Sequence, residues 1–214
     1  MHEQYADRDS RCYPSTDRAV QTDGNPQGQI FWLDSTTGPG KSTIAQTIAY
    51  QYNEASELGA SFCLRDGTEC SNINLIFPTI AHQLVCLYRP IIREHVSGAM
   101  HKDPDLSSAL ASRQLEKLMV EPLEAATQGF LPCLIVIDAL DECKDDKAVL
   151  SILSAIAMFT NRGRLFPLRF FITSRPVPVV QRGFLRHRPH GRYQHTGPAQ
   201  YSPRKSHRRI FAST

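Results

Sequence analysis

Four short apolar runs rich in β-branched and aromatic residues divide the middle of the chain. The most apolar run is hydrophobic without interruption from Cys133 to Ile137, which is typical of a central parallel strand with helices on both faces. Each of the other three is followed by polar or turn-forming residues, as short buried strands commonly are. We therefore predict strands over residues 30–33, 59–64, 132–138 and 168–173.

Between these runs, apolar residues recur at helical spacing. The clearest stripe is Val149, Ile152, Leu153, Ile156 and Phe159, which lie on one side of a helix. Two of the periodic stretches contain an internal proline, which should kink the helix or open a new first turn. We predict helices over residues 42–52, 73–87 (with Pro78), 106–128 (with Pro122) and 145–160.

Strands that alternate with helices indicate an α/β domain with a mostly parallel sheet in three αβα layers. We assign this domain to residues 28–181. The polar residues 1–27, punctuated by proline and glycine, form a poorly structured lead-in. After Val180 the apolar period stops, and residues 182–214 form a basic tail in which we predict no packed element and expect disorder.

The charge distribution agrees with this division. The chain of 214 residues has a formal net charge of +3. Residues 182–214 hold eight of its 24 Lys and Arg residues and no acid, so residues 1–181 hold 16 basic and 21 acidic residues, a net charge of −5. Basic residues interleave with Tyr193, Tyr201 and Phe211, but a solvated tail is the simpler interpretation. We do not expect nucleic acid as a partner.

The sequence also argues against a membrane-spanning, secreted or disulfide-rich protein. No apolar run approaches the roughly 18 residues that a membrane span needs, and the first residues, Met1 to Arg8, lack a signal-peptide pattern. The six cysteines form no Cys-x-x-Cys pair. We expect reduced thiols in a cytoplasmic protein with no membrane attachment.

The sharpest local signal lies between the first strand and the first helix. Residues 35–43 read Ser-Thr-Thr-Gly-Pro-Gly-Lys-Ser-Thr, close to the phosphate-binding pattern G-x-x-x-x-G-K-[ST]. In such a loop, backbone N–H groups and the helix N-terminus surround phosphate oxygens, the lysine neutralises them and the following hydroxyl binds Mg²⁺. We assign nucleotide binding to Thr37, Gly38, Pro39, Gly40, Lys41, Ser42 and Thr43, with Ser42 also a metal ligand.

One position departs from the pattern, because Ser35 stands where the first glycine is usual. A serine is disfavoured wherever φ must be positive, so nucleotide binding could be weakened. The alternative is an ordinary Gly-Pro-Gly turn with an exposed lysine.

Acidic residues follow the strand 132–138. Asp138 ends the strand at the sheet edge where the phosphate loop also opens, and we assign it to the magnesium site. Asp141 and Glu142 are close enough to orient or deprotonate an attacking water. Alternatively, Asp141 or Asp145 serves only as the N-cap of the helix 145–160.

The last strand also ends in a candidate site residue. Arg175 follows Thr173 and Ser174 and should open on the same edge, where a planar guanidinium suits phosphate oxygens. The alternative is that Arg175 pairs with an acidic residue of the domain.

Taken in order, these motifs resemble a known family. Phe31-Trp32-Leu33 before the loop, the Gly-Lys-Ser-Thr-Ile-Ala segment, Ile135 to Cys143, and Phe171 to Pro176 are similar to the NACHT-type signal-transduction NTPases of fungi. The likeness is greatest to their nephrocystin-3-like N-terminal domain and runs from about Gly28 to Gln181.

The resemblance implies a P-loop fold and a switch driven by ATP or GTP with Mg²⁺. It gives Lys41 and Ser42 the phosphate and magnesium roles, Asp138 a magnesium role, Asp141 with Glu142 the hydrolytic role, and Arg175 the sensor role. It also implies homo-oligomerisation or an effector protein as partner, through domains that are not recognisable after residue 181. A further edge strand of the sheet is also not recognised there, and we interpret the chain as a truncated family member.

Two other functions remain open. A small-molecule P-loop kinase should carry several phosphate-clamping arginines, but the basic residues between 42 and 137 are scattered at helical spacing. An interaction module that has lost nucleotide binding is the other alternative, which Ser35 makes reasonable.

Overall fold

The computed structural model describes residues 29–35, 40–65, 72–87, 89–125, 132–161, 168–186 and 193–196. Its centre is a parallel sheet in the order β2-β3-β4-β1-β5. The strands are β1 (Ile30–Asp34), β2 (Leu58–Cys63), β3 (Cys133–Asp138), β4 (Leu168–Ser174) and β5 (Tyr193–Thr196).

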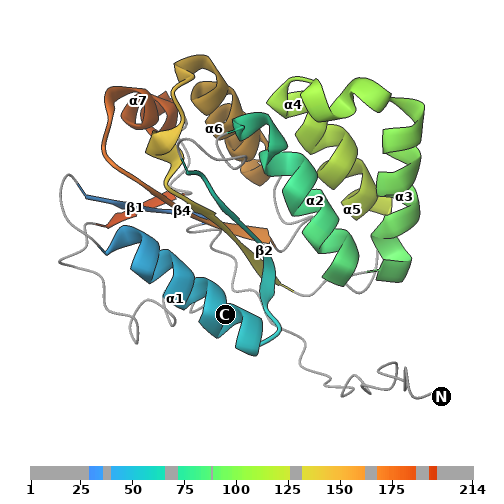
Figure 1. Ribbon diagram of the computed structural model, residues 1–214, viewed down its shortest axis with the longest axis horizontal. Coiled ribbons are helices and arrows are strands. Elements are labelled where there is room, and N and C mark those ends of the chain that lie inside the picture. Colours follow the sequence, from blue (N-terminus) through green and yellow to red (C-terminus); the bar gives the residue numbers. More distant parts are fainter. Residues whose placement is uncertain are drawn as a thin grey trace, which may run out of the picture.

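The helices are unequally divided between the two faces of this sheet (Figure 1). Helix α1 (Lys41–Glu54) covers one face by itself within the described part of the chain. The opposite face is covered by α2 (Ile76–Leu87), α4 (Ala111–Leu115), α6 (Asp146–Asn161) and α7 (Pro178–Arg186). Helix α3 (Arg89–Lys102) lies further out against α2, and α5 (Glu121–Ala125) packs against α3. The three-layer αβα prediction is confirmed.

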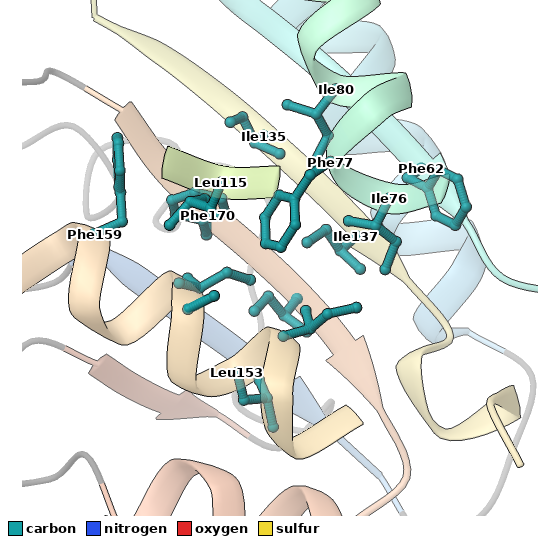
Figure 2. Packing of buried hydrophobic residues seen from close by; sticks show 14 of the residues in the cluster. Phe62, Ile76, Phe77, Ile80, Leu115, Ile135, Ile137, Leu153, Phe159 and Phe170 are labelled. Carbon is teal, nitrogen blue, oxygen red and sulfur yellow. The ribbon is translucent and has the colours of Figure 1, made fainter. Parts of the chain in front are cut away.

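Successive side chains of the central strands point to opposite faces of the sheet, which produces two separate cores. Leu134 and Val136 of β3 face α1, whereas Ile135 and Ile137 face the other helices. The larger core contains Phe77, which is 1% exposed, among the residues shown in Figure 2. Because β3 is buried at all six positions, its uninterrupted apolar sequence is explained by helices on both faces.

The segment predicted as one helix over 106–128 is divided. It contains the 3₁₀ turn η3 (Pro104–Ser108), α4, the π-helical turn η4 (Glu116–Val120) and α5. Pro122 lies just after η4, within a helical run that is continuous from residue 111 to 125, so its missing N–H falls where the π-helical turn already interrupts the regular hydrogen-bond pattern. Pro78 is the third residue of α2, in its first turn, where a missing N–H costs little.

Two predictions about the C-terminal part are corrected. The boundary at residue 181 falls inside α7, because Val180 and Phe184 are both buried one helical turn apart. The assignment of 182–214 as a tail without packed elements also missed β5, which extends the sheet beside β1 as an edge strand. The lead-in 1–27 and residues 197–214 lie outside the described residues.

Edge strand β2 is covered by a side chain. The amide of Gln83 in α2 accepts from the N–H of Ser61 and donates to the Ser61 carbonyl, both at 2.9 Å. A free strand edge favours pairing with other chains, so this bidentate contact protects it.

Candidate functional site

The carboxyl ends of the parallel strands meet at one edge of the sheet. The register pairs Asp34 of β1 with Ser174 of β4, and Cys63 of β2 with Asp138 of β3. Helix α1 begins after the end of β1. This edge therefore brings together the predicted residues Lys41, Asp138 and Arg175.

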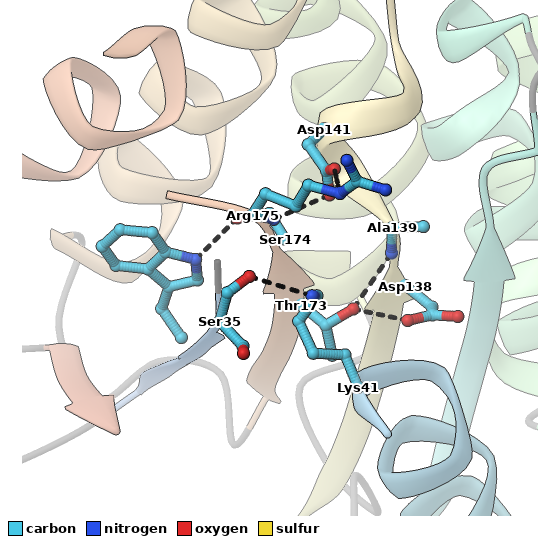
Figure 3. Close-up of polar contacts among 9 residues, drawn as sticks. Ser35, Lys41, Asp138, Ala139, Asp141, Thr173, Ser174 and Arg175 are labelled. Atoms are coloured by element: carbon cyan, nitrogen blue, oxygen red, sulfur yellow. Dashed lines mark hydrogen bonds and ion pairs between the residues drawn. The ribbon is translucent and has the colours of Figure 1, made fainter. Parts of the chain in front are cut away.

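Asp138 is held at the end of β3 by two neighbouring strands. The Thr173 hydroxyl donates to Asp138 Oδ1 and accepts the Ala139 N–H at 3.0 Å (Figure 3). The Cys63 thiol lies 3.4 Å from Asp138 Oδ2. Asp138 is only 4% exposed, so these contacts replace water at its carboxylate and fix its direction.

Cys63 responds electrostatically to this carboxylate. Partial burial, the negative charge of Asp138 and the hydrogen bond between them together raise the pKa of the Cys63 thiol to about 11. The thiol is therefore protonated near neutral pH and can act as a donor to Asp138.

The backbone turns sharply after Asp138. Ala139 adopts a left-handed conformation with φ 59° and ψ 44°, uncommon for a residue with a side chain. Its carbonyl accepts the Glu142 N–H at 2.9 Å, which closes the 3₁₀ turn η5 (Leu140–Glu142). This turn directs Asp141 and Glu142 away from the strand line at the sheet edge, and such local strain is common at functional sites.

Asp141 binds Arg175. Its Oδ1 accepts the Arg175 backbone N–H at 2.8 Å, and its Oδ2 lies 3.4 Å from Arg175 Nε. The Asp141 side chain is 9% exposed, whereas that of Arg175 is 68% exposed. Arg175 therefore does pair with an acid of the domain, while most of its side chain still faces solvent.

Lys41 is the first residue of α1, and its side chain reaches back to the end of β1. Its Nζ donates to the Ser35 carbonyl at 3.0 Å, near the ends of β1 and β4 in Figure 3. Gly40 precedes it with φ 154° and ψ −33°, a conformation that favours glycine. The glycine pattern of the loop thus has a backbone reason at this position.

The other predicted site residues divide into three groups. Ser42 and Thr43 lie in the first turn of α1 with exposed side chains. Glu142 is exposed beside Asp141. Thr37, Gly38 and Pro39 lie outside the described residues.

The sheet edge is also tied to α7. The indole Nε1 of Trp32 donates to the Ser174 hydroxyl at 2.8 Å, in a buried contact. The Trp32 ring stacks on Phe184 of α7 with centroids 4.5 Å apart and planes 19° apart. Three consecutive residues at the end of β4 therefore bind three different elements. Thr173 binds the end of β3, Ser174 binds the middle of β1, and Arg175 binds η5.

Sequence reasoning missed three of these contributors. Thr173 and Ser174 stood beside Arg175 in the same motif, and their hydroxyls at a strand end were the available signal. Cys63 ends β2 at the same edge, but a single thiol in a strand gave no comparable signal.

The described residues contain no group of three or more His, Cys, Asp or Glu side chains arranged to hold a metal ion. The available oxygen donors, Asp138 and Ser42, suit Mg²⁺, which commonly uses one or two protein ligands together with phosphate and water. Both Asp138 oxygens already accept hydrogen bonds, so this carboxylate fits a magnesium shell best through water.

Within the part of the chain that the structure describes, no helix is long and apolar enough to cross a bilayer.

Comparison with known proteins gives one family. The family model described as Nephrocystin 3, N-terminal, matches residues 15–175, which is most of the chain. The match begins within the lead-in that we had excluded from the domain and ends at Arg175. No curated protein matches the sequence.

Proposed function

The chain belongs to the nephrocystin 3 N-terminal family, and on that premise we propose that it is a NACHT-type switch that binds ATP or GTP with Mg²⁺. The observation that carries the proposal is the meeting of Lys41, Asp138 and Arg175 at one sheet edge, at the start of α1. Ligands of parallel α/β sheets characteristically bind at this edge.

In this proposal, the phosphates lie at the N-terminus of α1. The Lys41 amine exchanges its contact with the Ser35 carbonyl for phosphate oxygens, and the Gly40 turn lets the backbone approach them. Ser42 and Asp138 hold the Mg²⁺, which neutralises phosphate charge when bound.

The two acids after β3 have different roles in this proposal. Because Asp141 accepts both Arg175 contacts, it is a positioning residue that holds the sensor arginine. Glu142 is then the carboxylate that accepts a proton from water as the water oxygen attacks the γ-phosphorus, and the bond to the leaving diphosphate breaks. The products are a nucleoside diphosphate and inorganic phosphate.

The switch requires a structural connection to other parts of the protein. Ser174 lies next to Arg175 and holds Trp32, which stacks on α7. A change at Arg175 on nucleotide binding would therefore reach α7 through two contacts. We propose that an oligomer or an effector protein responds to this change.

A direct test uses Trp32, the only tryptophan in the chain, as the energy donor to N-methylanthraniloyl ATP and GTP. We expect saturable energy transfer in the presence of Mg²⁺ and its loss in Lys41→Ala. The matched control is Lys147→Ala, which removes an exposed lysine from the first turn of α6. Equal binding by both variants would contradict the phosphate site.

The same experiment separates the alternatives. Absence of binding by the parent chain would leave an interaction module without nucleotide. Transfer of the γ-phosphoryl group to a small-molecule acceptor, rather than to water, would favour a kinase.

A further inference from the structure

A groove of about 500 Å³ lies between α2 and α3, on the opposite face of the sheet from α1. Helix α2 lines it with positions 78, 81, 82, 85 and 86, and α3 with positions 93, 96, 97 and 100. These spacings of three, four, seven and eight residues place one continuous stripe of each helix toward the groove. The groove is thus a property of the helix pair, with a volume typical of small-molecule sites.

The floor of the groove is apolar and firmly packed. Ala81, Val96 and Leu118 are 1%, 9% and 2% exposed, and they belong to one small cluster. Leu118 comes from η4, whose π-helical turn interrupts the helical segment between α4 and α5. Such turns are often retained at functional sites. An apolar ligand body would therefore meet a preformed surface.

The rim is polar and basic. His82, Arg93 and Ser97 have exposed side chains along it, and none of the described residues that line the groove is acidic. No carboxylate forms an ion pair with Arg93 within the described part of the chain. The neighbouring Gln83 points to β2 and takes no part. An exposed guanidinium beside an apolar floor favours a ligand that is both apolar and anionic.

We propose that this groove binds an amphipathic carboxylate, such as a medium-chain fatty acid or an aryl-alkanoic acid. Its apolar body lies on the partly exposed Val85 and Met100, above the buried cluster of Ala81, Val96 and Leu118, and its carboxylate meets Arg93 at the rim. The Ser97 hydroxyl is available as a second donor to the carboxylate. This site shares no residue with the proposed phosphate site, so it stands independently of nucleotide binding.

The test is isothermal titration of the full chain at neutral pH with decanoate, kept below its micelle concentration, and with the uncharged 1-decanol. We expect decanoate to bind at least roughly fivefold more tightly, because an exposed charged hydrogen bond contributes about that factor. Arg93→Gln should abolish this preference. Lys102→Gln, which removes an exposed charge from the last turn of α3 outside the groove, should leave it unchanged.

A second variant tests the groove without altering charge. Ser97→Phe adds bulk at an exposed lining position, so it should block decanoate and preserve the folded core. The proposal is overturned if the parent chain shows no saturable binding, if decanol binds as tightly as decanoate, or if either groove variant binds like the parent. Normal far-ultraviolet circular dichroism and thermal unfolding of the variants exclude loss of fold as the cause.

Discussion

Helices α1 and α6 both begin at the carboxyl edge of the sheet, but they begin in different ways. At α6, Asp145 Oδ1 accepts the N–H groups of Lys147 and Ala148 at 2.9 and 3.1 Å, and Asp146 adds an acid in the first turn. At α1, the preceding residue is Gly40, which has no side chain to cap the helix, and no acid lies in the first turn.

The difference shows which helix is prepared for an external anion. The positive end of the α6 dipole is neutralised by the protein's own carboxylates. The start of α1 carries Lys41 instead, which adds positive charge to the same end of the dipole. A phosphate group would supply the missing negative charge at α1, whereas at α6 it would meet two aspartates.

The largest effect should come from the two adjacent phenylalanines of β4, which serve opposite faces. Phe171 stacks on Phe31 under α1, and Phe170 packs against Phe159 of α6. Replacement of either by alanine should lower the free energy of unfolding by about 3–5 kcal/mol. Only Phe171→Ala should also weaken nucleotide binding, because only that residue supports α1.

Urea denaturation and nucleotide titration of both variants would measure this pair. If an alanine variant does not fold, Phe170→Leu and Phe171→Leu allow the same comparison with smaller expected losses of stability. Equal losses of nucleotide affinity in the two variants would contradict a special role for the α1 face.

Gly40→Ala should have the next largest effect. Apart from its chain neighbours, no atom of the described residues lies within 4 Å of a Cβ at this position, so the cost of about 1–3 kcal/mol arises from φ 154°. Gly98→Ala is the matched control, because Gly98 also has open space but lies in helix α3. That control should be neutral or stabilising. Chemical denaturation of both would show whether the α1 turn requires glycine.

Asp145→Ala should destabilise the protein by about 1 kcal/mol through loss of the α6 cap. Nucleotide affinity should not change, since this helix end takes no part in the site. Asp145→Asn, which keeps an acceptor oxygen, should recover most of the stability. A fall in nucleotide affinity with Asp145→Ala would show that the two helix starts are coupled.

The last prediction concerns a reaction rate and no change in stability, at two thiols: Cys63, beside Asp138, and Cys143, shortly before α6. The pKa of Cys63 is raised to about 11, and burial also raises that of Cys143. The thiolate is the reactive form of cysteine. Alkylation of Cys63 at pH 8 should therefore be on the order of a hundredfold slower than that of a thiol with a pKa of 9.0. The rate should increase as the pH rises toward 11. Asp138→Asn should accelerate Cys63 and leave Cys143 unchanged, as measured by mass spectrometry after iodoacetamide treatment.

Strands β1 to β4 and helices α1, α2 and α6 could be predicted because each carries a strong local pattern of apolar residues. The run from Cys133 to Ile137 is apolar at every position, and α6 repeats its apolar residues over about three turns, from Val149 to Phe159. Helix α3 was missed, because only one narrow stripe, Ile92, Val96 and Met100, is apolar on this outer helix.

Helix α7 was missed for another reason. Val179, Val180 and Phe184 continue a helical stripe, but the Arg- and His-rich sequence that follows suggested that packing had ended. What secures Phe184 is Trp32, a residue 152 positions earlier in the chain. A contact of that separation leaves no local pattern.

The candidate site shows the same limit. Topology alone predicted that Lys41, Asp138 and Arg175 would share an edge, because parallel strands end together. The partner of each carboxylate could not be predicted. Asp145 rather than Asp141 caps α6, and Asp141 holds Arg175, which depends on the left-handed turn at Ala139.

Amide hydrogen exchange tests the central claim most directly, since the two helix starts serve as site and control in one molecule. Addition of ATP or GTP with Mg²⁺ should slow exchange in the first turn of α1, residues 41–44, and leave the first turn of α6, residues 146–149, unchanged. The protection at α1 should disappear in Lys41→Ala. Equal protection of both turns, or none at α1 when nucleotide is present at saturating concentration, would contradict the account.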